Sequence, residues 1–374
     1  MRIAVDARFL QADTISEYKI FTKEVMLRLA KLYAVHHFIF LSDTPIDPLI
    51  NLPENVTSVV ITPKPTNVLL YKWWYDIKVP LALKKYKTDV FICTSGLCSL
   101  TTLIPQVLFV HDLAFLHNAV FFSKDSLSFY RNFTRRFLKK AKVIAALSNF
   151  IKEEIISSYN IPPKKITVIG SAADSSFKPL HWEEREKVKE QYARGCEYFV
   201  FTGGLNPAKN LINLLKAFSI FKKWQKTNMK LVVIIHAGEY KEQTDKLNSY
   251  KYKNELLFAE NLSKHELAHV TGGAYAMIFP SFYEGFGVAV LEAMQCEVPV
   301  ITSSHTSMVE IAGDAALYAN PENPQEIAEE MKRIFKDEQL RNKLISNGRE
   351  RVKAYSWDKT SSLTWQLIQE AVSE

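Results

Sequence analysis

The sequence has few cysteines and no long apolar run. Its 374 residues include four cysteines, Cys93, Cys98, Cys196 and Cys296, which are scattered along the chain and form no CxxC pair. Four scattered cysteines fit reduced thiols in the cytoplasm better than a disulfide framework or a zinc site, so we expect a cytoplasmic location. No uninterrupted apolar stretch reaches the length of about 18 residues that a membrane-spanning helix needs. We therefore expect no transmembrane segment.

The amino-terminal segment lacks the pattern of a secretion signal, and acidic residues are scarce in the first half of the chain. Residues 1–10 predict a strand, with no apolar run ahead of a small-residue cleavage site. Residues 1–180 hold 23 Lys and Arg against 14 Asp and Glu, a balance of +9, whereas residues 181–374 hold 24 against 26, a balance of −2. A basic first half favours contact with an anionic membrane surface or a phosphate-bearing acceptor. A solvated lysine-rich surface explains the same charges.

Short apolar segments alternate with amphipathic helices along the whole chain. The expected strands are residues 3–5, 37–41, 90–93, 107–110, 143–147, 198–202, 230–235, 276–279 and 299–302, and helices are expected near residues 21–33, 211–224, 288–296 and 324–335. This alternation is typical of βα units with parallel sheets. We expect an α/β protein with two Rossmann-like, doubly wound domains that face each other across a cleft, because ligands of such sheets bind at the carboxyl ends of the strands.

The length exceeds that of one ordinary core and suits two domains of about 150–200 residues. The predicted N-terminal domain comprises residues 1–178 and the predicted C-terminal domain residues 179–355. A proline-containing stretch at residues 177–180 and a charged helical stretch at residues 183–192 separate the last strand of the first domain from the strand that begins at Tyr198. Residues 356–374 are expected to form a helix that packs back on the N-terminal domain.

The segment from Ala276 to Cys296 carries the strongest chemical signal. A strand is followed by the turn Glu284-Gly285-Phe286-Gly287 and by a helix that begins near Val288. Glycines ahead of a helix let backbone amides approach a ligand, and the positive end of the helix dipole favours a diphosphate. Glu284 can reach a sugar hydroxyl, and Glu292, one turn into the helix, can accept two hydrogen bonds from a ribose diol. Packing glycines and solvated glutamates are the alternative.

This segment resembles the signature of the retaining glycosyltransferases of family four, which share the GT-B fold. Their mark is a pair of glutamates separated by seven residues, which correspond to Glu284 and Glu292 here, and residues 298–300 and 310–316 also fit the family context. The resemblance implies that a sugar is transferred from a nucleoside-diphosphate sugar, GDP-mannose or a UDP-sugar, to a hydroxyl acceptor with retained configuration. The pattern is most similar to bacterial mannosyltransferase-type enzymes of polysaccharide assembly.

A second part of the resemblance is the segment FTGGLNPAKN at residues 201–210, in which a strand and a glycine turn precede a lysine and a helix. In the family the matching lysine holds the donor phosphates, which assigns this role to Lys209, with Gly203 and Gly204 in the phosphate turn. A lysine there neutralises a departing diphosphate. The family often carries arginines where this chain has Gly204 and Ala208, so Lys209 is left as the single expected cation. A surface lysine at a helix start is the alternative.

A third part of the resemblance lies in the first half, at the end of the expected strand 107–110. The family has a histidine facing the cleft beside the transferred sugar at the position of His111. Catalytic groups gather at the carboxyl ends of such strands. We therefore count His111 with Glu284 and Lys209 as candidate catalytic residues, and Asp112 as a candidate acceptor-side residue. A structural histidine and a capping aspartate are the respective alternatives.

The fourth family feature, a glycine-rich GxGxxT loop after the first strand, is not preserved. Glu17 and Lys19 occupy the glycine positions, whereas Phe21 and Thr22 fit the pattern. Side chains at these positions would crowd the approach of a phosphate to the backbone. Three explanations stay open: the loop is displaced, the acceptor differs, or activity is lost. An inactive scaffold or binding subunit is therefore one rival function, and a sugar-nucleotide epimerase of the same fold is another.

The sequence contains no Asp-x-Asp triplet, so we expect no metal-bridged diphosphate and no cofactor beside the nucleotide-sugar co-substrate. The expected partners are the nucleotide-sugar donor and a glycan or lipid-linked acceptor. Residues 124–142 interleave basic and aromatic side chains, which favours either peripheral contact with the inner face of the membrane or a helix packed on the core with a solvated outer face. We expect no nucleic-acid partner, because no nucleic-acid-binding module accompanies the charge.

Overall fold

The computed structural model describes residues 1–11, 17–235, 247 and 249–373. The chain folds into two compact units, which are Met1–Ser171 with Trp357–Glu374 (unit 1) and Ala172–Ser356 (unit 2). The predicted boundary after residue 178 falls inside unit 2, because the preceding residues pack on that unit. Phe177 belongs to its core, and the Gln295 amide donates hydrogen bonds to the carbonyl oxygens of Asp174 (3.0 Å) and Phe177 (2.6 Å).

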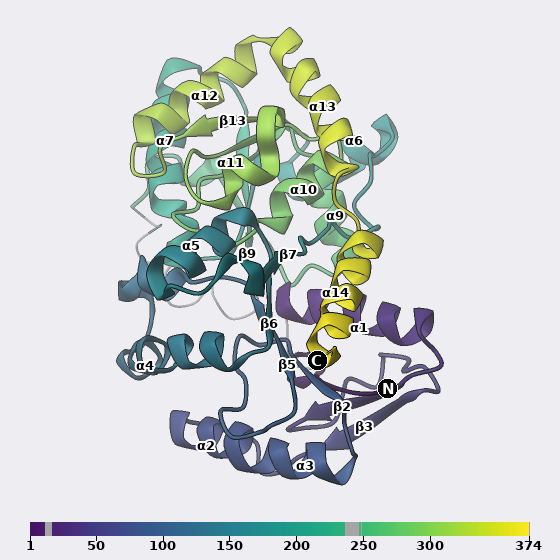
Figure 1. Ribbon diagram of the computed structural model, residues 1–374. Helices are drawn as coiled ribbons and strands as arrows, with labels where there is room; N and C mark the ends of the chain where they lie inside the picture. Colours follow the sequence, from purple (N-terminus) through teal and green to yellow (C-terminus); the bar gives the residue numbers. More distant parts are fainter. Residues whose placement is uncertain (12–16, 236–246, 248, 374) are drawn as a thin grey trace. The chain divides into compact units, whose positions relative to one another are not determined.

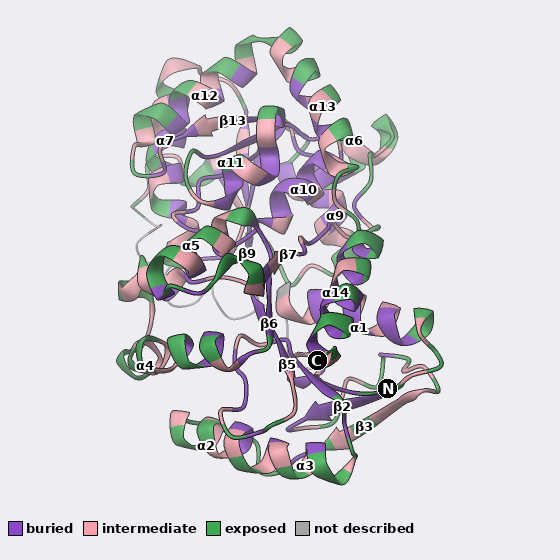
Figure 2. Cartoon of the chain, viewed as in Figure 1, coloured by how far each residue is buried: buried purple, intermediate pink, exposed green. Residues whose placement is uncertain are grey.

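The described part of unit 1 contains a seven-stranded parallel sheet with the order β3-β2-β1-β4-β5-β6-β7 (Figure 1). Its strands are β1 (Arg2–Asp6), β2 (His37–Ser42), β3 (Val56–Val60), β4 (Val90–Cys93), β5 (Gln106–Val110), β6 (Val143–Ala146) and β7 (Ile166–Val168). The central strands β4, β5 and β6 are buried along their whole length, and Figure 2 shows β6 in purple. Burial on both faces explains why these strands are almost entirely apolar.

Helices cover the sheet of unit 1, and the last helix of the chain is one of them. The helices are α1 (Glu17–Leu32), α2 (Val68–Trp73), α3 (Val79–Lys85), α4 (Lys124–Lys140), α5 (Asn149–Tyr159) and α14 (Trp357–Val372), with a π-helical turn at Trp74–Lys78. Helix α14 packs on α1 and on β4, β5 and β6. The Trp365 ring stacks on the Tyr33 ring with centroids 3.7 Å apart, and Arg28 Nε lies 3.1 Å from Asp358 Oδ1. The C-terminal helix therefore completes unit 1.

The described part of unit 2 contains a six-stranded parallel sheet with the order β10-β9-β8-β11-β12-β13. Its strands are β8 (Tyr198–Thr202), β9 (Lys230–Ile235), β10 (Leu256–Glu260), β11 (Ala276–Phe279), β12 (Val300–Ser303) and β13 (Ala316–Ala319), and its helices are α6 (Trp182–Ala193), α7 (Leu211–Trp224), α9 (Lys264–Gly272), α10 (Val288–Gln295), α11 (Ser307–Ala312), α12 (Pro324–Lys336) and α13 (Glu338–Val352). Alternate strand residues face two separate cores, so Val200 packs with α10 while Phe199 packs with α7. Both units are doubly wound α/β structures, as the sequence predicts.

No helix in the described ranges is long and apolar enough to cross a membrane.

Candidate functional site

The strand order of each sheet reverses at one point. In unit 2 the reversal lies between the neighbouring strands β8 and β11, and in unit 1 it lies between β1 and β4. In open α/β sheets, ligands bind outside the carboxyl ends of the strands at this point. Lys209 follows β8 and Glu284 follows β11, so the topology itself brings two of the predicted site residues together.

Lys209 and Glu284 form an ion pair in unit 2. Lys209 Nζ lies 2.7 Å from Glu284 Oε1, and the two side chains are only 20% and 7% exposed. The same ammonium lies 5.3 Å from the centre of the Phe279 ring, at a distance typical of a cation–π contact. An ammonium held between a carboxylate and an aromatic ring has little rotational freedom, so its position is defined before any ligand arrives.

The backbone around Lys209 explains how the lysine reaches this position. It ends a single 3₁₀ turn, Pro207–Lys209, rather than lying in the following helix α7. Gly203 has φ +126°, and a Cβ added there would lie 2.7 Å from Lys209 Cγ. Glycine is therefore required both for the backbone conformation and for the close passage of the lysine side chain. The absence of a side chain at Gly203 thus makes room for the Lys209 side chain.

Asn210 is a site-supporting residue that the sequence reasoning missed. It is buried with a left-handed backbone, φ 69° and ψ 36°, and its side-chain amide donates to the carbonyl oxygens of Pro280 (2.9 Å) and Pro321 (2.6 Å). The amide of Phe282 also donates to the carbonyl oxygen of Ala208 at 3.0 Å. These bonds tie the Lys209 turn to the segment that carries Glu284. An asparagine directly after the lysine was the available signal, because asparagine tolerates this conformation.

Helix α10 begins at the glycine turn as predicted. Gly287 is its N-cap, with φ 85° and ψ 56°, and the Ser307 hydroxyl donates to the Glu284 carbonyl oxygen at 2.8 Å. Tyr283 and Phe286 of the turn are buried, so their side chains anchor the turn in unit 2. Glu292 lies half-buried in the second turn of α10. The amino end of α10 suits an anion, because the positive end of a helix dipole favours negative charge.

Replacing Gly287 with alanine is expected to destabilise unit 2. An L-residue at this positive φ costs about 1–3 kcal/mol, and the new Cβ would lie 2.1 Å from Met308 Cε, so the buried Met308 side chain must also move. Gly170→Ala is the matched control, since Gly170 has φ +72° with nothing within 4 Å of an added Cβ. The midpoint of thermal unfolding should fall further for Gly287→Ala than for Gly170→Ala. Equal shifts would show that Met308 makes way without cost.

In unit 1, His111 lies immediately after β5 and is surrounded by aromatic rings. The Tyr18 ring centre lies 4.3 Å away and the Phe21 ring centre 5.0 Å away. Burial lowers the pKa of His111 to about 4, although the hydrogen bond to Thr94 opposes this shift. Nε2 lies 2.9 Å from the carbonyl oxygen of Thr94, which can only accept, so Nε2 carries the proton. His111 is therefore neutral at pH 7, and its Nδ1 is a hydrogen-bond acceptor.

Two hydrogen bonds fix the position of the Asp112 carboxylate. Its Oδ1 accepts from the amide of Ala114 at 2.9 Å, and its Oδ2 accepts from the Tyr18 hydroxyl at 2.8 Å. The first contact is a bond within the turn after β5 rather than a helix cap, because the 3₁₀ turn Ala114–Leu116 has Leu113 as its N-cap and no side-chain cap. The second contact links Asp112 to α1. One oxygen thus orders the turn after β5, and the other positions the ring that packs on His111.

The two positions where the family has loop glycines lie at the start of a helix in this chain. Glu17 and Lys19 belong to helix α1, and residues 12–16 lie outside the described part of the chain. Lys19 Nζ lies 3.0 Å from Asp47 Oδ2 and donates to the Gln11 carbonyl oxygen at 2.8 Å. The lysine at an expected glycine position therefore pairs with a carboxylate of its own unit.

A buried charged cluster at the switch point of unit 1 was also missed by the sequence reasoning. Arg8 Nε lies 3.1 Å from Asp6 Oδ1, and Asp6 Oδ2 accepts from the hydroxyls of Tyr75 (2.6 Å) and Ser95 (2.7 Å). The Arg8 guanidinium lies 5.0 Å from the centre of the Trp74 ring. Asp6 and Arg8 are two residues apart, but Tyr75 and Ser95 come 69 and 89 positions after Asp6. Only the tertiary structure therefore reveals the whole cluster.

Two doubly wound units with parallel sheets are the architecture of GT-B proteins, and the Lys209–Glu284 pair lies at the switch point of the second unit. Family models match the chain in succession: Glycosyltransferase Family 4 matches residues 20–177, and Glycosyl transferases group 1 matches residues 183–351. The chain belongs to the family 4 glycosyltransferases.

Similar proteins agree with this assignment. O-antigen chain mannosyltransferase B of Escherichia coli is 27% identical over 256 residues, which are 68% of this chain and 67% of that protein. O-antigen chain mannosyltransferase RfbU of Salmonella typhimurium is 26% identical over 323 residues, with 86% and 84% covered. The crystal structure of HepE from Anabaena in complex with UDP and glucose superposes with a TM-score of 0.76 at 15% identity, covering 98% of this chain and 99% of that one. At this identity the structural likeness concerns the fold.

Proposed function

We propose that this chain transfers a sugar from a nucleoside-diphosphate sugar to a hydroxyl group of a glycan or lipid-linked saccharide, with retained anomeric configuration. The observation that carries the proposal is the Lys209–Glu284 ion pair at the switch point of unit 2. A cation and a carboxylate held together at the carboxyl ends of parallel strands suit a ligand that has both phosphate oxygens and sugar hydroxyls.

The chemistry follows from where charge develops. As the bond between the sugar C1 and the diphosphate oxygen breaks, negative charge grows on the diphosphate. Lys209 Nζ and the amides of Gly285, Phe286 and Gly287 at the start of α10 stabilise that charge, which is usually the largest catalytic contribution. The acceptor oxygen forms the new bond to C1 on the same face, and its proton passes to the departing phosphate. We therefore assign no protein general base and no metal ion.

The two glutamates have different tasks in this scheme. Glu284 accepts a hydrogen bond from a hydroxyl of the donor sugar while its Oε1 holds Lys209. Glu292, half-buried in α10, accepts from the ribose hydroxyls. In unit 1, neutral His111 can accept a hydrogen bond from a sugar hydroxyl through Nδ1, and Asp112 lies next to it on the acceptor side.

The comparisons support two donor classes and a role in polysaccharide biosynthesis. The two similar O-antigen chain mannosyltransferases favour GDP-mannose as the donor and a surface polysaccharide as the product. The structural neighbour that holds UDP and glucose favours a UDP-sugar. Both donors present the same diphosphate to Lys209 and differ in the base and the sugar.

We also propose that the enzyme acts in the cytoplasm at the inner face of the membrane. Helix α4 buries Thr134, Phe137 and Leu138 against unit 1 and exposes Arg131, Arg135, Arg136 and Lys139 on its outer surface. Just before this helix, Val120 is 84% exposed. A basic surface with an exposed apolar residue suits an anionic membrane that contains a lipid-linked acceptor.

A thermal-stability screen against GDP, UDP and ADP tests the donor site. A nucleotide present at about 100 times its dissociation constant should stabilise the folded protein by about 2.7 kcal/mol, which raises the unfolding midpoint by several degrees. We expect GDP or UDP to produce this shift and ADP to produce little. The proposal is contradicted if none of the three nucleotides changes the midpoint.

A further inference from the structure

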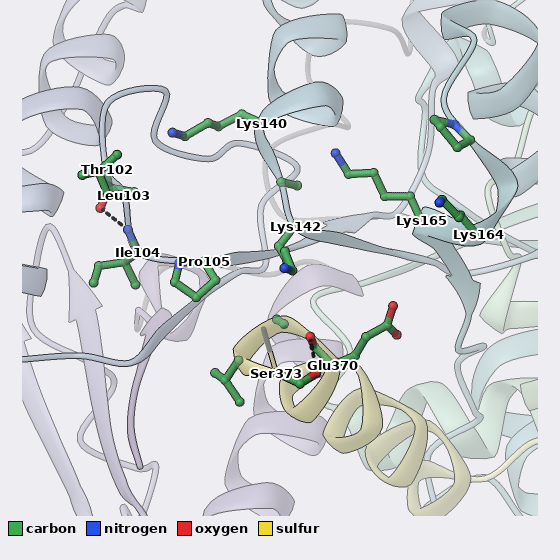
Figure 3. Close-up of a pocket in the computed structure, with 14 residues that line it drawn as sticks. Thr102, Leu103, Ile104, Pro105, Lys140, Lys142, Lys164, Lys165, Glu370 and Ser373 are labelled. Atoms are coloured by element: carbon green, nitrogen blue, oxygen red, sulfur yellow. Dashed lines mark hydrogen bonds between the residues drawn. The ribbon is translucent and has the colours of Figure 1, made fainter.

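A hollow with a volume of about 690 Å³ lies in unit 1 and is lined by none of the candidate site residues (Figure 3). It is lined by the segments that lead into β5, β6 and β7 and by the last turn of α14. Pro105 directly precedes β5, Lys142 directly precedes β6 and Lys165 directly precedes β7. The hollow therefore lies at the amino ends of three adjacent parallel strands.

His111 lies at the opposite end of β5 from this hollow. The strand spans Gln106–Val110, and at about 3.3 Å per residue its ends are roughly 15 Å apart. The ligands of open parallel sheets bind at the carboxyl ends of the strands. A ligand in the hollow would therefore occupy a different place from the acceptor-side residues of unit 1.

Four lysines line the hollow, against a single acidic lining residue among residues 1–11, 17–235, 247 and 249–373. The lysines are Lys140, Lys142, Lys164 and Lys165, and the acidic residue is Glu370. In the described ranges none of the four is within ion-pair distance of a carboxylate, and Lys165 Nζ donates to the carbonyl oxygen of Lys139 at 2.8 Å. Partial burial lowers the pKa of Lys165, which means that the protein does not compensate its charge fully. Four cations around one hollow favour an anion with more than one negative charge.

Part of the wall of the hollow is apolar, beside the polar side chains of Thr102, Glu370 and Ser373. Leu103, Ile104, Pro105 and Val372 contribute to the lining, and Leu103 is 95% exposed. Figure 3 shows the Thr102–Pro105 segment and the end of α14 on different sides of the hollow from Lys164 and Lys165. The volume is also far larger than one phosphate ion and falls within the range of about 300–1,000 Å³ that is usual for small-molecule sites.

We propose that this hollow binds a ligand in which a multiply charged phosphate group adjoins an apolar portion. The lysines contact the phosphate oxygens, and the Leu103 side contacts the apolar portion. Such a group occurs both in membrane phospholipids and in soluble phosphorylated molecules. The proposal is independent of the sugar-transfer function, because it rests on residues that take no part in the donor site.

Site-resolved amine labelling of the full chain tests the proposal. Lysines are acetylated with a limiting reagent, and modification is quantified by mass spectrometry, first with inorganic diphosphate and then with vesicles of phosphatidylcholine with or without phosphatidylglycerol. At ten times the dissociation constant, labelling of Lys142 and Lys164 should fall about tenfold. Lys31 and Lys84, exposed elsewhere in unit 1, should be unaffected. Because each lysine is read separately, diphosphate binding at Lys209 does not confuse the result.

A pair of matched variants completes the test. Lys142→Ala with Lys164→Ala removes two exposed lysines of the hollow, and Lys31→Ala with Lys84→Ala removes the same charge elsewhere. Protection by diphosphate would support a soluble phosphorylated ligand. Protection by phosphatidylglycerol vesicles alone, with vesicle binding about 30-fold weaker in the first variant only, would support a lipid phosphate. Uniform protection of all lysines, no protection, or equal weakening in both variants would overturn the proposal.

Discussion

Replacing Lys209 with methionine is expected to lower the rate of donor turnover by about 10²–10³-fold. Methionine keeps an unbranched side chain that can pass over Gly203, where an added Cβ would lie 2.7 Å from Lys209 Cγ, so the turn should retain its shape. The variant lacks the ammonium that lies 2.7 Å from Glu284 Oε1 and that we assign to the departing diphosphate. The measurement is the release of nucleoside diphosphate from the sugar nucleotide whose base stabilises the protein.

Lys216→Met is the matched control for this variant. Lys216 is exposed on α7 and bonds the side chain of Asn213 at 3.3 Å, so its loss should leave turnover unchanged. Wild-type protein that binds a nucleotide but never releases diphosphate would favour the scaffold alternative instead. Conversion of the donor to a new sugar nucleotide without acceptor would favour an epimerase. Equal turnover by Lys209→Met and wild type would remove Lys209 from the mechanism.

Replacing Arg8 with methionine is expected to cause the largest loss of stability, about 3–5 kcal/mol near pH 7, because a buried carboxylate loses its partner. Burial alone would raise the pKa of Asp6, but the Arg8 guanidinium and the hydrogen bonds from Tyr75 and Ser95 outweigh it and lower this pKa. The folded-state pKa of Asp6 lies below its unfolded-state pKa. The ion pair therefore stabilises the native protein fully at pH values above the unfolded-state pKa, and this stabilisation is lost as the pH falls through the folded-state pKa.

The pH dependence of the Arg8→Met variant has the opposite sign. Without the guanidinium, burial raises the pKa of Asp6, so protonation favours the folded variant as the pH falls. The stability difference from wild type, measured by urea unfolding, should therefore shrink between about pH 7 and about pH 5. Arg2→Met, at the exposed start of β1, the strand that ends at Asp6, should cost little. Asp6→Asn combined with Arg8→Met should recover part of the loss. A deficit that is independent of pH would argue against the buried-pair explanation.

The sequence predicted the central strands well and the outer ones poorly. Strands β8, β9 and β11 and helix α7 have the bounds that the apolar runs indicated, because residues buried on both faces of a sheet leave a continuous apolar signal. The strands β3, β7, β10 and β13 were not predicted, and these are the four outermost strands of the two sheets in the described ranges. An edge strand has a neighbouring strand on one side only, so it is less buried and its apolar pattern is weaker. Strand β3, for example, contains only exposed and half-buried residues.

The end of the first domain shows a second limit of the sequence. The stretch before Pro179 reads as a linker, yet Phe177 is a fully buried core residue and Asp174 pairs with Lys264. Lys264 and Gln295, which hold this stretch, come about 90 and 120 residues later in the chain. No local sequence pattern predicts such long-range contacts, because the composition of a segment says nothing about which distant residues pack against it.

By itself the sequence determined the family, the two doubly wound halves and the short segments that carry the site. A strand, a glycine turn and a charged residue are local features, so Lys209 and Glu284 could be named from residues 201–210 and 276–296 alone. Only the tertiary structure decided that the two form an ion pair, since they are 75 positions apart and meet where the order of β8 and β11 reverses. The same holds for the Asp6–Arg8–Tyr75 cluster and for the four lysines of the hollow. Strand order, rather than any local sequence pattern, sets which distant side chains become neighbours.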